Sequence, residues 1–253
     1  MKQEFRRKHI LKLLDKNEVV SIQELVSQCS ISEITARRDL TLLEKQGLLK
    51  RTHGGATRNY STTEMIGFDT NALDHQMQKI NICNLASTLI EDNDTIYMDC
   101  GTTVFYLARF LPKFKNIRVI TNSLPIVLEL LPYPNIVVNL IGGELDNSLK
   151  AFYGSMTESL MARYKADKAF IGTGGISLAN GLSSNSEKSA LVTLKMAEAA
   201  SKVYLLCDSS KIEKDSYFNF SGLSLIETII TDNEISQERI DLYKEKNINI
   251  LTT

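Results

Sequence analysis

Apolar residues in the first part of the chain recur at the spacing of an amphipathic helix. Ile10, Leu13 and Leu14 lie three and four positions apart, so they share one face of a predicted first helix. The segment Ser21–Glu24 has the S-x-x-E pattern of a capping box, in which each side chain binds a free backbone N–H group of the other residue. This pattern predicts a second, short helix that ends near Gln28.

A third, longer helix is predicted over residues 32–46. It begins with a serine, a common N-cap residue, and Gly47 is placed to end it. Ala36, Leu40 and Leu43 recur at helical spacing and should face the core.

The opposite face of this third helix combines arginine, threonine and an apolar side chain. At about 100° per residue, Ile34, Arg38 and Thr41 form that face, and Thr35 and Arg37 flank it. Arginine binds guanine or phosphate, threonine binds phosphate, and an apolar group contacts the thymine methyl. A surface helix with solvated arginines is the alternative interpretation, but the short capped helix and tight turn before it favour DNA contact.

After the third helix, the sequence LLKRTHGGATR alternates as a two-stranded hairpin with Gly54–Gly55 near its turn. Lys50, Arg51, His53 and Arg58 would lie near a phosphate backbone. Two short helices, a longer helix and a basic hairpin form the order of a winged helix-turn-helix. The predicted DNA-contacting residues are Ser32, Ile34, Thr35, Arg37, Arg38, Thr41, Lys50, Arg51 and His53.

The second part of the chain has a different pattern. A polar stretch at 58–74 is interpreted as a linker between a DNA-binding domain at 1–57 and a larger domain at 75–253. In the larger domain, short apolar runs alternate with helical segments, which predicts a mainly parallel α/β sheet. The predicted strands are 95–99, 118–121, 136–141, 168–172, 203–208, 227–232 and the closing INILT.

Several of these strands end in loops rich in Gly, Thr, Ser and Asn. The sharpest is 99–103, DCGTT, which joins a glycine that permits close backbone approach, two hydroxyl groups and a predicted helix start. A plain turn with a threonine N-cap is the alternative. TNS at 121–123, GTGG at 172–175 and DSSK at 208–211 end other strands, and ligands of parallel sheets bind beyond such carboxyl ends. The loops therefore predict a phosphate site.

Two charged residues fit this site. Lys211 is the cation that lies close behind the strand ends and could pair with a phosphate as a point charge. Glu187 could accept hydrogen bonds from sugar hydroxyls. An exposed loop lysine and a solvated glutamate near a helix start are the alternatives.

Charge and cysteine usage limit the class of protein. The net charge is −1, yet residues 1–58 hold 12 Lys/Arg and 7 Asp/Glu, a net charge of +5, which leaves −6 for the rest. The four cysteines lack metal-ligand spacing, so we expect no metal, no cofactor and a cytoplasmic location. The sequence contains neither an apolar run of roughly 20 residues nor a signal-peptide pattern, so we expect no membrane contact.

The segment ISEITARRDLTLLEKQGLLKRTHGGA resembles the signature of the DeoR family of bacterial transcriptional regulators, V-S-x-x-T-I-R-R-D-L, then L-E-x-x-G and H-G-G-A. This chain has Ile31 for the usual valine and Ala36 for the usual isoleucine. The motifs D-x-G-T-T, T-N-S, G-G-x-L and D-x-S-K resemble the effector domain of the same family. That domain is related to the ribose-5-phosphate isomerase fold and generally senses a phosphorylated sugar.

Matched position by position, the resemblance implies a site for a sugar phosphate. It places phosphate on Gly101, Thr102, Thr103 and Lys211, and sugar hydroxyls near Asp99, Asn122 and Glu187, beside the loop of Gly172 and Gly174. The expected function is a repressor of a carbohydrate operon whose affinity for double-stranded operator DNA is controlled by this ligand. Because specific sites are usually read as paired half-sites, we expect a homo-oligomer, a dimer or a tetramer.

Two alternatives remain open, of which the second belongs to another class of protein. One is a regulator that senses an unphosphorylated metabolite. The other is a sugar-phosphate isomerase or hydrolase, which needs a positioned base and supporting acids. Asp99, Glu187 and Asp208 are scattered, and an enzyme has no evident use for a recognition helix, so we expect no catalysis.

Overall fold

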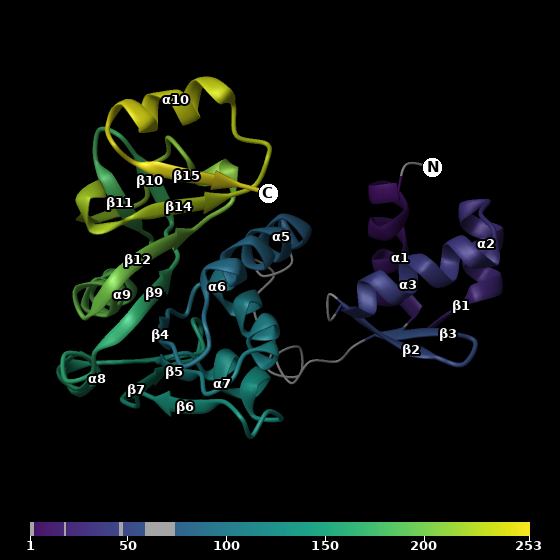
Figure 1. Cartoon of the computed structure of the whole chain (residues 1–253), viewed down its shortest axis with the longest axis horizontal. Coiled ribbons are helices and arrows are strands. Elements are labelled where there is room, and N and C mark those ends of the chain that lie inside the picture. Colours follow the sequence, from purple (N-terminus) through teal and green to yellow (C-terminus); the bar gives the residue numbers. More distant parts are fainter. Residues whose placement is uncertain (1–2, 18, 46–47, 59–73) are drawn as a thin grey trace. The chain divides into compact units, whose positions relative to one another are not determined.

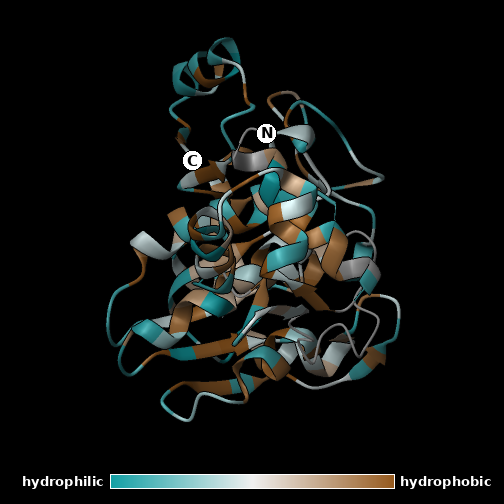
Figure 2. Cartoon of the chain, turned by 90° about the vertical axis from the view of Figure 1, so that its right-hand side faces the viewer, coloured by the Kyte–Doolittle hydropathy of each residue, from teal (hydrophilic) through white to brown (hydrophobic). Residues whose placement is uncertain are grey.

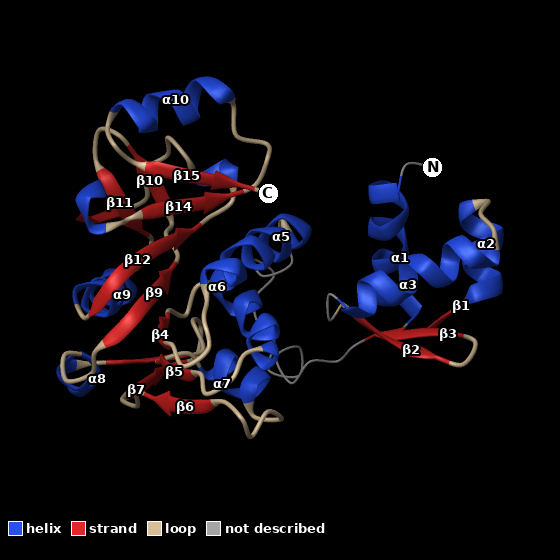
Figure 3. Cartoon of the chain, in the orientation of Figure 1, coloured by secondary structure: helices blue, strands red, loops and turns tan. Residues whose placement is uncertain are grey.

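The computed structural model describes residues 3–17, 19–45, 48–58 and 74–253. The chain divides into two compact units, residues 1–61 and 62–253 (Figure 1). Over its described residues the first unit contains helices and a small antiparallel sheet, and the second contains a seven-stranded sheet with helices on its faces (Figure 3).

The first unit follows the predicted order of elements. Its helices and strands are α1 (Gln3–Asn17), β1 (Val19–Ser21), α2 (Ile22–Cys29), α3 (Glu33–Lys45), β2 (Leu49–Thr52) and β3 (Gly55–Arg58). The predicted hairpin is confirmed as β2 and β3, and β1 adds a third strand in the order β1-β3-β2. Strand β1 approaches so closely that a Cβ atom on Gly55 would lie 2.0 Å from the carbonyl oxygen of Val20.

The predicted cap of α2 is confirmed in one direction. Ser21 Oγ accepts a hydrogen bond from the backbone N–H of Glu24 at 3.1 Å, while the Glu24 carboxylate accepts one from Gln28 Nε2. The helix ends at Cys29, because Ser30 adopts a left-handed conformation with φ of 53°. The predicted end of the third helix at Gln46 and Gly47 lies outside the described residues.

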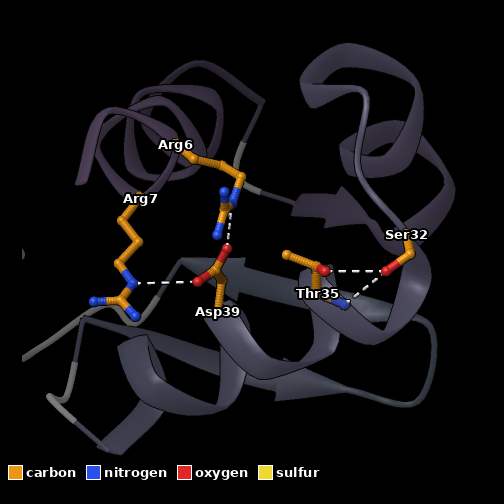
Figure 4. A network of polar contacts seen from close by, with 5 residues as sticks. All are labelled: Arg6, Arg7, Ser32, Thr35 and Asp39. Atoms are coloured by element: carbon orange, nitrogen blue, oxygen red, sulfur yellow. Dashed lines mark hydrogen bonds and ion pairs between the residues drawn. The ribbon is translucent and has the colours of Figure 1, made fainter. Parts of the chain in front are cut away.

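The inner face of α3 holds the three predicted core residues and a buried carboxylate that the sequence reading missed. Asp39 Oδ2 lies 2.5 Å from Arg6 Nε, and Asp39 Oδ1 lies 3.2 Å from Arg7 Nε (Figure 4). The Asp39 side chain is only 2% exposed. One carboxylate thus connects two consecutive residues of α1 to the middle of α3.

The second unit is built on a fully parallel sheet, which confirms the predicted fold class. Its strand order is β15-β14-β12-β9-β4-β5-β6, and every neighbouring pair is parallel. The strands are β4 (Thr95–Met98), β5 (Arg118–Thr121), β6 (Val137–Leu140), β9 (Ala166–Ile171), β12 (Ala200–Leu206), β14 (Thr228–Thr231) and β15 (Asn249–Thr252).

Helices cover both faces of this sheet. Figure 1 shows α5, α6 and α7 on one side and α8 and α9 on the other. The helices are α5 (Gln76–Ala86), α6 (Thr102–Phe105), α7 (Leu124–Leu130), α8 (Ser155–Met161), α9 (Glu187–Glu198) and α10 (Gln237–Glu245), and the 3-10 helices are η1 (Ser87–Leu89), η2 (Tyr106–Lys113), η3 (Ser209–Lys211) and η4 (Leu223–Leu225). At the top of Figure 2, α10 is largely hydrophilic and buries Tyr243 on its inner side.

The structure differs from the predicted pattern in its short strands. It adds a hairpin of β7 (Glu144–Asp146) and β8 (Ala151–Tyr153), and a small antiparallel sheet of β10 (Gly175–Ser177), β11 (Gly181–Ser184) and β13 (Phe218–Ser221). Strands this short are too brief to show alternation clearly. The helix predicted after β4 is α-helical only over α6 and continues as the 3-10 helix η2, which contains Pro112.

Replacing Asp39 with Ala should lower the free energy of unfolding of the first unit by about 3–5 kcal/mol, because the buried guanidinium group of Arg6 and the partly buried one of Arg7 lose their carboxylate. Glu33→Ala is the matched control on the same helix. The ion pair between Glu33 and Arg37 is exposed, so its loss should cost less than about 1 kcal/mol. Urea unfolding followed by circular dichroism measures both variants, and equal shifts would contradict the anchoring role of Asp39.

Candidate functional site

The exposed side of α3 presents the side chains that were predicted to contact DNA. Ile34 is 80% exposed, and Arg37 and Arg38 are also exposed. Arg37 Nη2 lies 3.6 Å from Glu33 Oε2, whereas Arg38 has no ion-pair partner in the described part of the chain. An unpaired arginine beside an exposed apolar side chain suits contact with base edges and phosphates.

The first turn of α3 is held by its own hydroxyl groups. Ser32 Oγ accepts a hydrogen bond from the backbone N–H of Thr35 at 3.3 Å and lies 3.0 Å from Thr35 Oγ1 (Figure 4). Both hydroxyls therefore have a structural role at the N-terminus of the helix. Any contact they make with DNA uses their remaining hydrogen-bonding capacity.

Thr41 and Arg51 attach the β2–β3 hairpin to α3. Thr41 Oγ1 donates to the Arg37 carbonyl at 2.8 Å and accepts a hydrogen bond from Arg51 Nη1 at 3.0 Å. The backbone N–H of Arg51 donates to Glu44 Oε1 at 2.9 Å. These hydrogen bonds hold the hairpin against α3. Thr41 and Arg51 therefore have a structural role in addition to any contact with DNA.

The remaining basic residues of the hairpin lie at its surface. Lys50 on β2 and His53 in the turn are both exposed. The side chain of Arg58 lies outside the described residues. An exposed lysine on a hairpin next to α3 is placed to contribute sequence-independent attraction to phosphate.

In the second unit, most of the predicted ligand-binding residues gather in one cleft beyond the carboxyl ends of β4, β9 and β12. The cleft is lined by Asp99, Gly101, Thr102, Thr103, Gly172, Thr173, Gly174, Ser184, Ser189, Ala190, Thr193, Lys211 and Phe220. Seven of the nine residues predicted for the ligand site line it. Loops that are far apart in the sequence meet here because parallel strands end at the same edge of the sheet.

Asp99 joins two of these loops. Its Oδ1 accepts a hydrogen bond from the backbone N–H of Gly101 at 2.7 Å, and its Oδ2 accepts one from Gly172 at 2.6 Å. Burial raises the pKa of the Asp99 carboxyl above its usual value, and the hydrogen bonds from Gly172 and Gly101 oppose that shift. Because both oxygens face N–H donors, the ionised carboxylate is the form that satisfies this geometry.

Two lysines give the region of the cleft positive charge. Lys211 Nζ donates to the carbonyl oxygen of Thr173 at 2.9 Å, which directs the ammonium group to the cleft. Lys79 on α5 is only 3% exposed, and burial, followed by the charge of Lys211, lowers its pKa to about 8. The carboxylates of Asp208 and Asp74 act in the opposite direction on the pKa of Lys79.

The GTT loop supplies a hydroxyl group without a partner. Thr103 Oγ1 is buried and has no hydrogen-bond partner among the described residues. The helix that follows is only the four residues of α6, so its dipole is weaker than the predicted long helix would provide. Hydroxyl groups and backbone N–H groups are therefore the principal donors of this loop.

Asn122 and Glu187 do not line the cleft. Asn122 is fully buried, and its Nδ2 donates to the carbonyl oxygen of Phe152 at 2.9 Å. Glu187 is exposed at the start of α9, where Tyr217 donates its hydroxyl to Oε1 at 3.3 Å. Contacts of these two residues with a sugar remain predictions.

Within the described ranges, no group of three or more His, Cys, Asp and Glu residues is arranged to hold a metal ion. No helix in this part of the chain is both long and apolar enough to cross a membrane.

Two family models match nearly the whole chain. The model of the DeoR-like helix-turn-helix domain matches residues 6–62, and the model of the DeoR C terminal sensor domain matches residues 74–233. The chain belongs to the DeoR family. Both matches agree with the motifs that carried the resemblance.

Individual DeoR-family relatives align over nearly their full length. The Lactose phosphotransferase system repressor of Lactococcus lactis subsp. lactis is 36% identical over 97% of both chains. The uncharacterized HTH-type transcriptional regulator FruR of Bacillus subtilis (strain 168) is 34% identical over 96% of both chains. The HTH-type transcriptional regulator GlpR of Haloferax volcanii is 33% identical over 93% of both chains.

Solved structures resemble this DeoR-family chain more distantly. Ribose 5-phosphate isomerase from Plasmodium falciparum has 18% sequence identity and a TM-score of 0.39 over 54% of this chain and 52% of that chain. Pyrococcus horikoshii OT3 translation initiation factor eIF-2B has 15% identity and a TM-score of 0.43 over 91% and 82%. A likeness of this size has no bearing on the activity of the chain.

Several residues near the cleft of this DeoR-family protein were not predicted as site residues. The additional lining residues are Thr173, Ser184, Ser189, Ala190, Thr193 and Phe220, and Lys79 on α5 lies near Lys211. Ser184 and Ser189 belong to the polar segment around Glu187. The sequence pattern indicated this segment but could not show which of its side chains face the cleft. Phe220 is on a short strand that periodicity did not reveal.

Replacing Asp99 with Asn should lower the free energy of unfolding of the second unit by about 1–3 kcal/mol. An amide accepts only through Oδ1, so its NH2 group would face one of the two backbone N–H donors. Asp241→Asn on the exposed side of α10 is the control and should change stability by less than about 0.5 kcal/mol. Thermal unfolding measures both, and an equally stable Asp99 variant would contradict the need for two acceptor oxygens.

Proposed function

We propose that this DeoR-family regulator binds operator DNA through the exposed side of α3 and its hairpin, and that a phosphorylated sugar in the cleft controls this binding. Residues 1–57 contact DNA, residues 75–253 bind the effector, and residues 58–74 link the two. The lactose phosphotransferase system repressor among its relatives supports the same role here, repression of a carbohydrate operon.

The arrangement around Lys211 is the observation that carries the proposal. The ammonium group of Lys211 held toward the cleft, the buried Lys79 nearby and the unpaired hydroxyl of Thr103 favour a ligand that is anionic and accepts several hydrogen bonds. A phosphate monoester has both properties. The polar wall of Ser184, Ser189 and Thr193 offers hydroxyl groups to the sugar.

The effector releases the protein from DNA in this proposal. By linkage, a ligand changes DNA affinity only as far as it binds the DNA-competent and incompetent states differently. A repressor that is released when its sugar phosphate accumulates would allow expression of the genes that consume the sugar.

Catalysis has no place in this proposal. Both oxygens of Asp99 accept backbone hydrogen bonds, and the Asp208 carboxylate accepts one from Ser210, so neither is a free base. Glu187 lies outside the cleft. The regulator acts in the cytoplasm, where its operator is, and acts as at least a dimer so that it can read paired half-sites.

Replacing Lys211 with Met should weaken binding of the phosphorylated sugar about ten- to a hundredfold, because a charge-assisted contact with phosphate is lost. Lys214→Met, an exposed lysine in the same loop that does not line the cleft, is the matched control. A thermal-shift screen of sugars and their phosphate esters, followed by calorimetric titration, measures the effect. Equal stabilisation by a free sugar and its phosphate would instead indicate an unphosphorylated effector.

Replacing Arg38 with Ala should weaken operator binding by about 1–3 kcal/mol and relax the preference for one base if Arg38 reads a base edge. Lys12→Ala, an exposed lysine on α1, is the control. Fluorescence anisotropy with operator and unrelated duplexes distinguishes the possibilities. Equal weakening on both duplexes would make Arg38 a phosphate contact, and unchanged affinity would remove α3 from the DNA interface.

A further inference from the structure

Strand β6 forms an open edge of the seven-stranded sheet. The N–H of Val137 donates to the carbonyl of Ile117 at 3.0 Å, and the N–H of Ile141 donates to Thr121 at 2.8 Å. Peptide groups alternate in direction along a strand, so Val138 and Leu140 direct their N–H and C=O groups away from β5. Among the described strands none lies beyond β6 on that side (Figure 1).

This edge is short and follows Pro132 and Pro134, but it lacks the charged side chains that commonly protect an edge strand. Residues 130–143 include no charged residue. Exposed apolar side chains concentrate in the same segment, with exposed fractions between 38% and 73% for Leu131, Tyr133, Val137 and Leu140. Free edge strands of proteins usually carry lysine, a bulge or an inward-pointing charge that blocks association.

The other edge of the same sheet is different. Strand β15 follows Lys244, Glu245 and Lys246, and its Ile250 is buried. Charges next to a short strand discourage the addition of another strand. Of the two edges of this sheet, β6 is therefore the one whose surroundings favour the addition of another strand.

We propose that β6 pairs antiparallel with β6 of a second copy of this chain, about a two-fold axis at Asn139. In this register Val138 of each copy faces Leu140 of the other, and their outward N–H and C=O groups form four backbone hydrogen bonds. The proposal assigns a surface to the dimer of the proposed function. It does not depend on the identity of the effector.

Self-complementarity identifies the partner as a second copy. The two-fold register places an apolar side chain opposite an apolar side chain and Asn139 opposite itself. Asn139 is partly exposed, and two amide side chains that face each other across the axis can hydrogen-bond to each other. Because residues 59–253 carry a net charge of −6, an uncharged segment is where two such surfaces meet with least repulsion.

Sedimentation of the full chain with Val138→Pro tests the pairing. The N–H of Val138 points away from the sheet, so the monomer should tolerate proline while the pairing loses two hydrogen bonds and meets two bulky rings. We expect self-association to weaken at least about tenfold. Thr252→Pro is the matched control, because the N–H of Thr253 bonds to Thr231 and that of Thr252 therefore also points outward from an edge.

Two cysteine substitutions test the same pairing without introducing a proline that could unfold the chain. Under mild oxidation Asn139→Cys should form an intermolecular disulfide, because residues on the axis have Cα atoms about 4.5 Å apart. Val137→Cys should not, since its two copies would lie about 13 Å apart along the strands. The unsubstituted chain controls for its own four cysteines.

Each outcome decides a different claim. A wild-type dimer that Val138→Pro leaves intact, with no cross-link through Asn139→Cys, would overturn the β6 pairing and leave the proposed dimer standing on another surface. A monomeric wild type would overturn both. A failure to bind the effector would contradict the proposed role of the cleft, and it would leave the β6 pairing unaffected.

Discussion

The two hydrogen bonds that Asp99 accepts hold together the loops on which the proposed sensor site depends. Gly101 follows β4 and Gly172 follows β9, so one carboxylate connects the ends of neighbouring strands. The lysine that faces the cleft is fixed in turn by the carbonyl of Thr173, the residue after Gly172. The GTT loop therefore depends on Asp99, as does Lys211 through Gly172 and Thr173, and Thr193 Oγ1 lies 3.5 Å from the same carboxylate. A change at Asp99 would disturb these parts of the cleft.

A buried carboxylate has a similar function in the first unit. Asp39 lies on the inner side of α3 directly after the exposed Arg37 and Arg38, and its ion pairs with Arg6 and Arg7 connect the helix to α1. Rotation of α3 about its axis would break these contacts and also move the side chains that face DNA. In both units, then, the residues proposed to bind a ligand are positioned by an aspartate that does not itself need to touch it.

Much of this architecture could be predicted from the sequence because its physical causes are local. Helical spacing identified the core of α3, and apolar runs identified all seven parallel strands, whose glycine-rich ends must meet at one edge. The sequence could not show which long-range contacts form there. Asn122 has the right loop chemistry yet is turned to Phe152, and Lys79 on α5 comes near Lys211 only through tertiary packing. The short strands that bring Ser184 and Phe220 to the cleft lacked enough residues for a pattern.

The most direct test of the account is the affinity of the full chain for its operator, titrated with phosphorylated sugars and their free counterparts. Anisotropy of a labelled operator duplex, with wild type and Lys211→Met side by side, measures it. The account predicts that one phosphate ester weakens operator binding by wild type, that its free sugar does not, and that Lys211→Met binds the operator but no longer responds. Operator affinity that is unchanged or increased by every phosphate ester would contradict the claim that the cleft controls DNA binding by release.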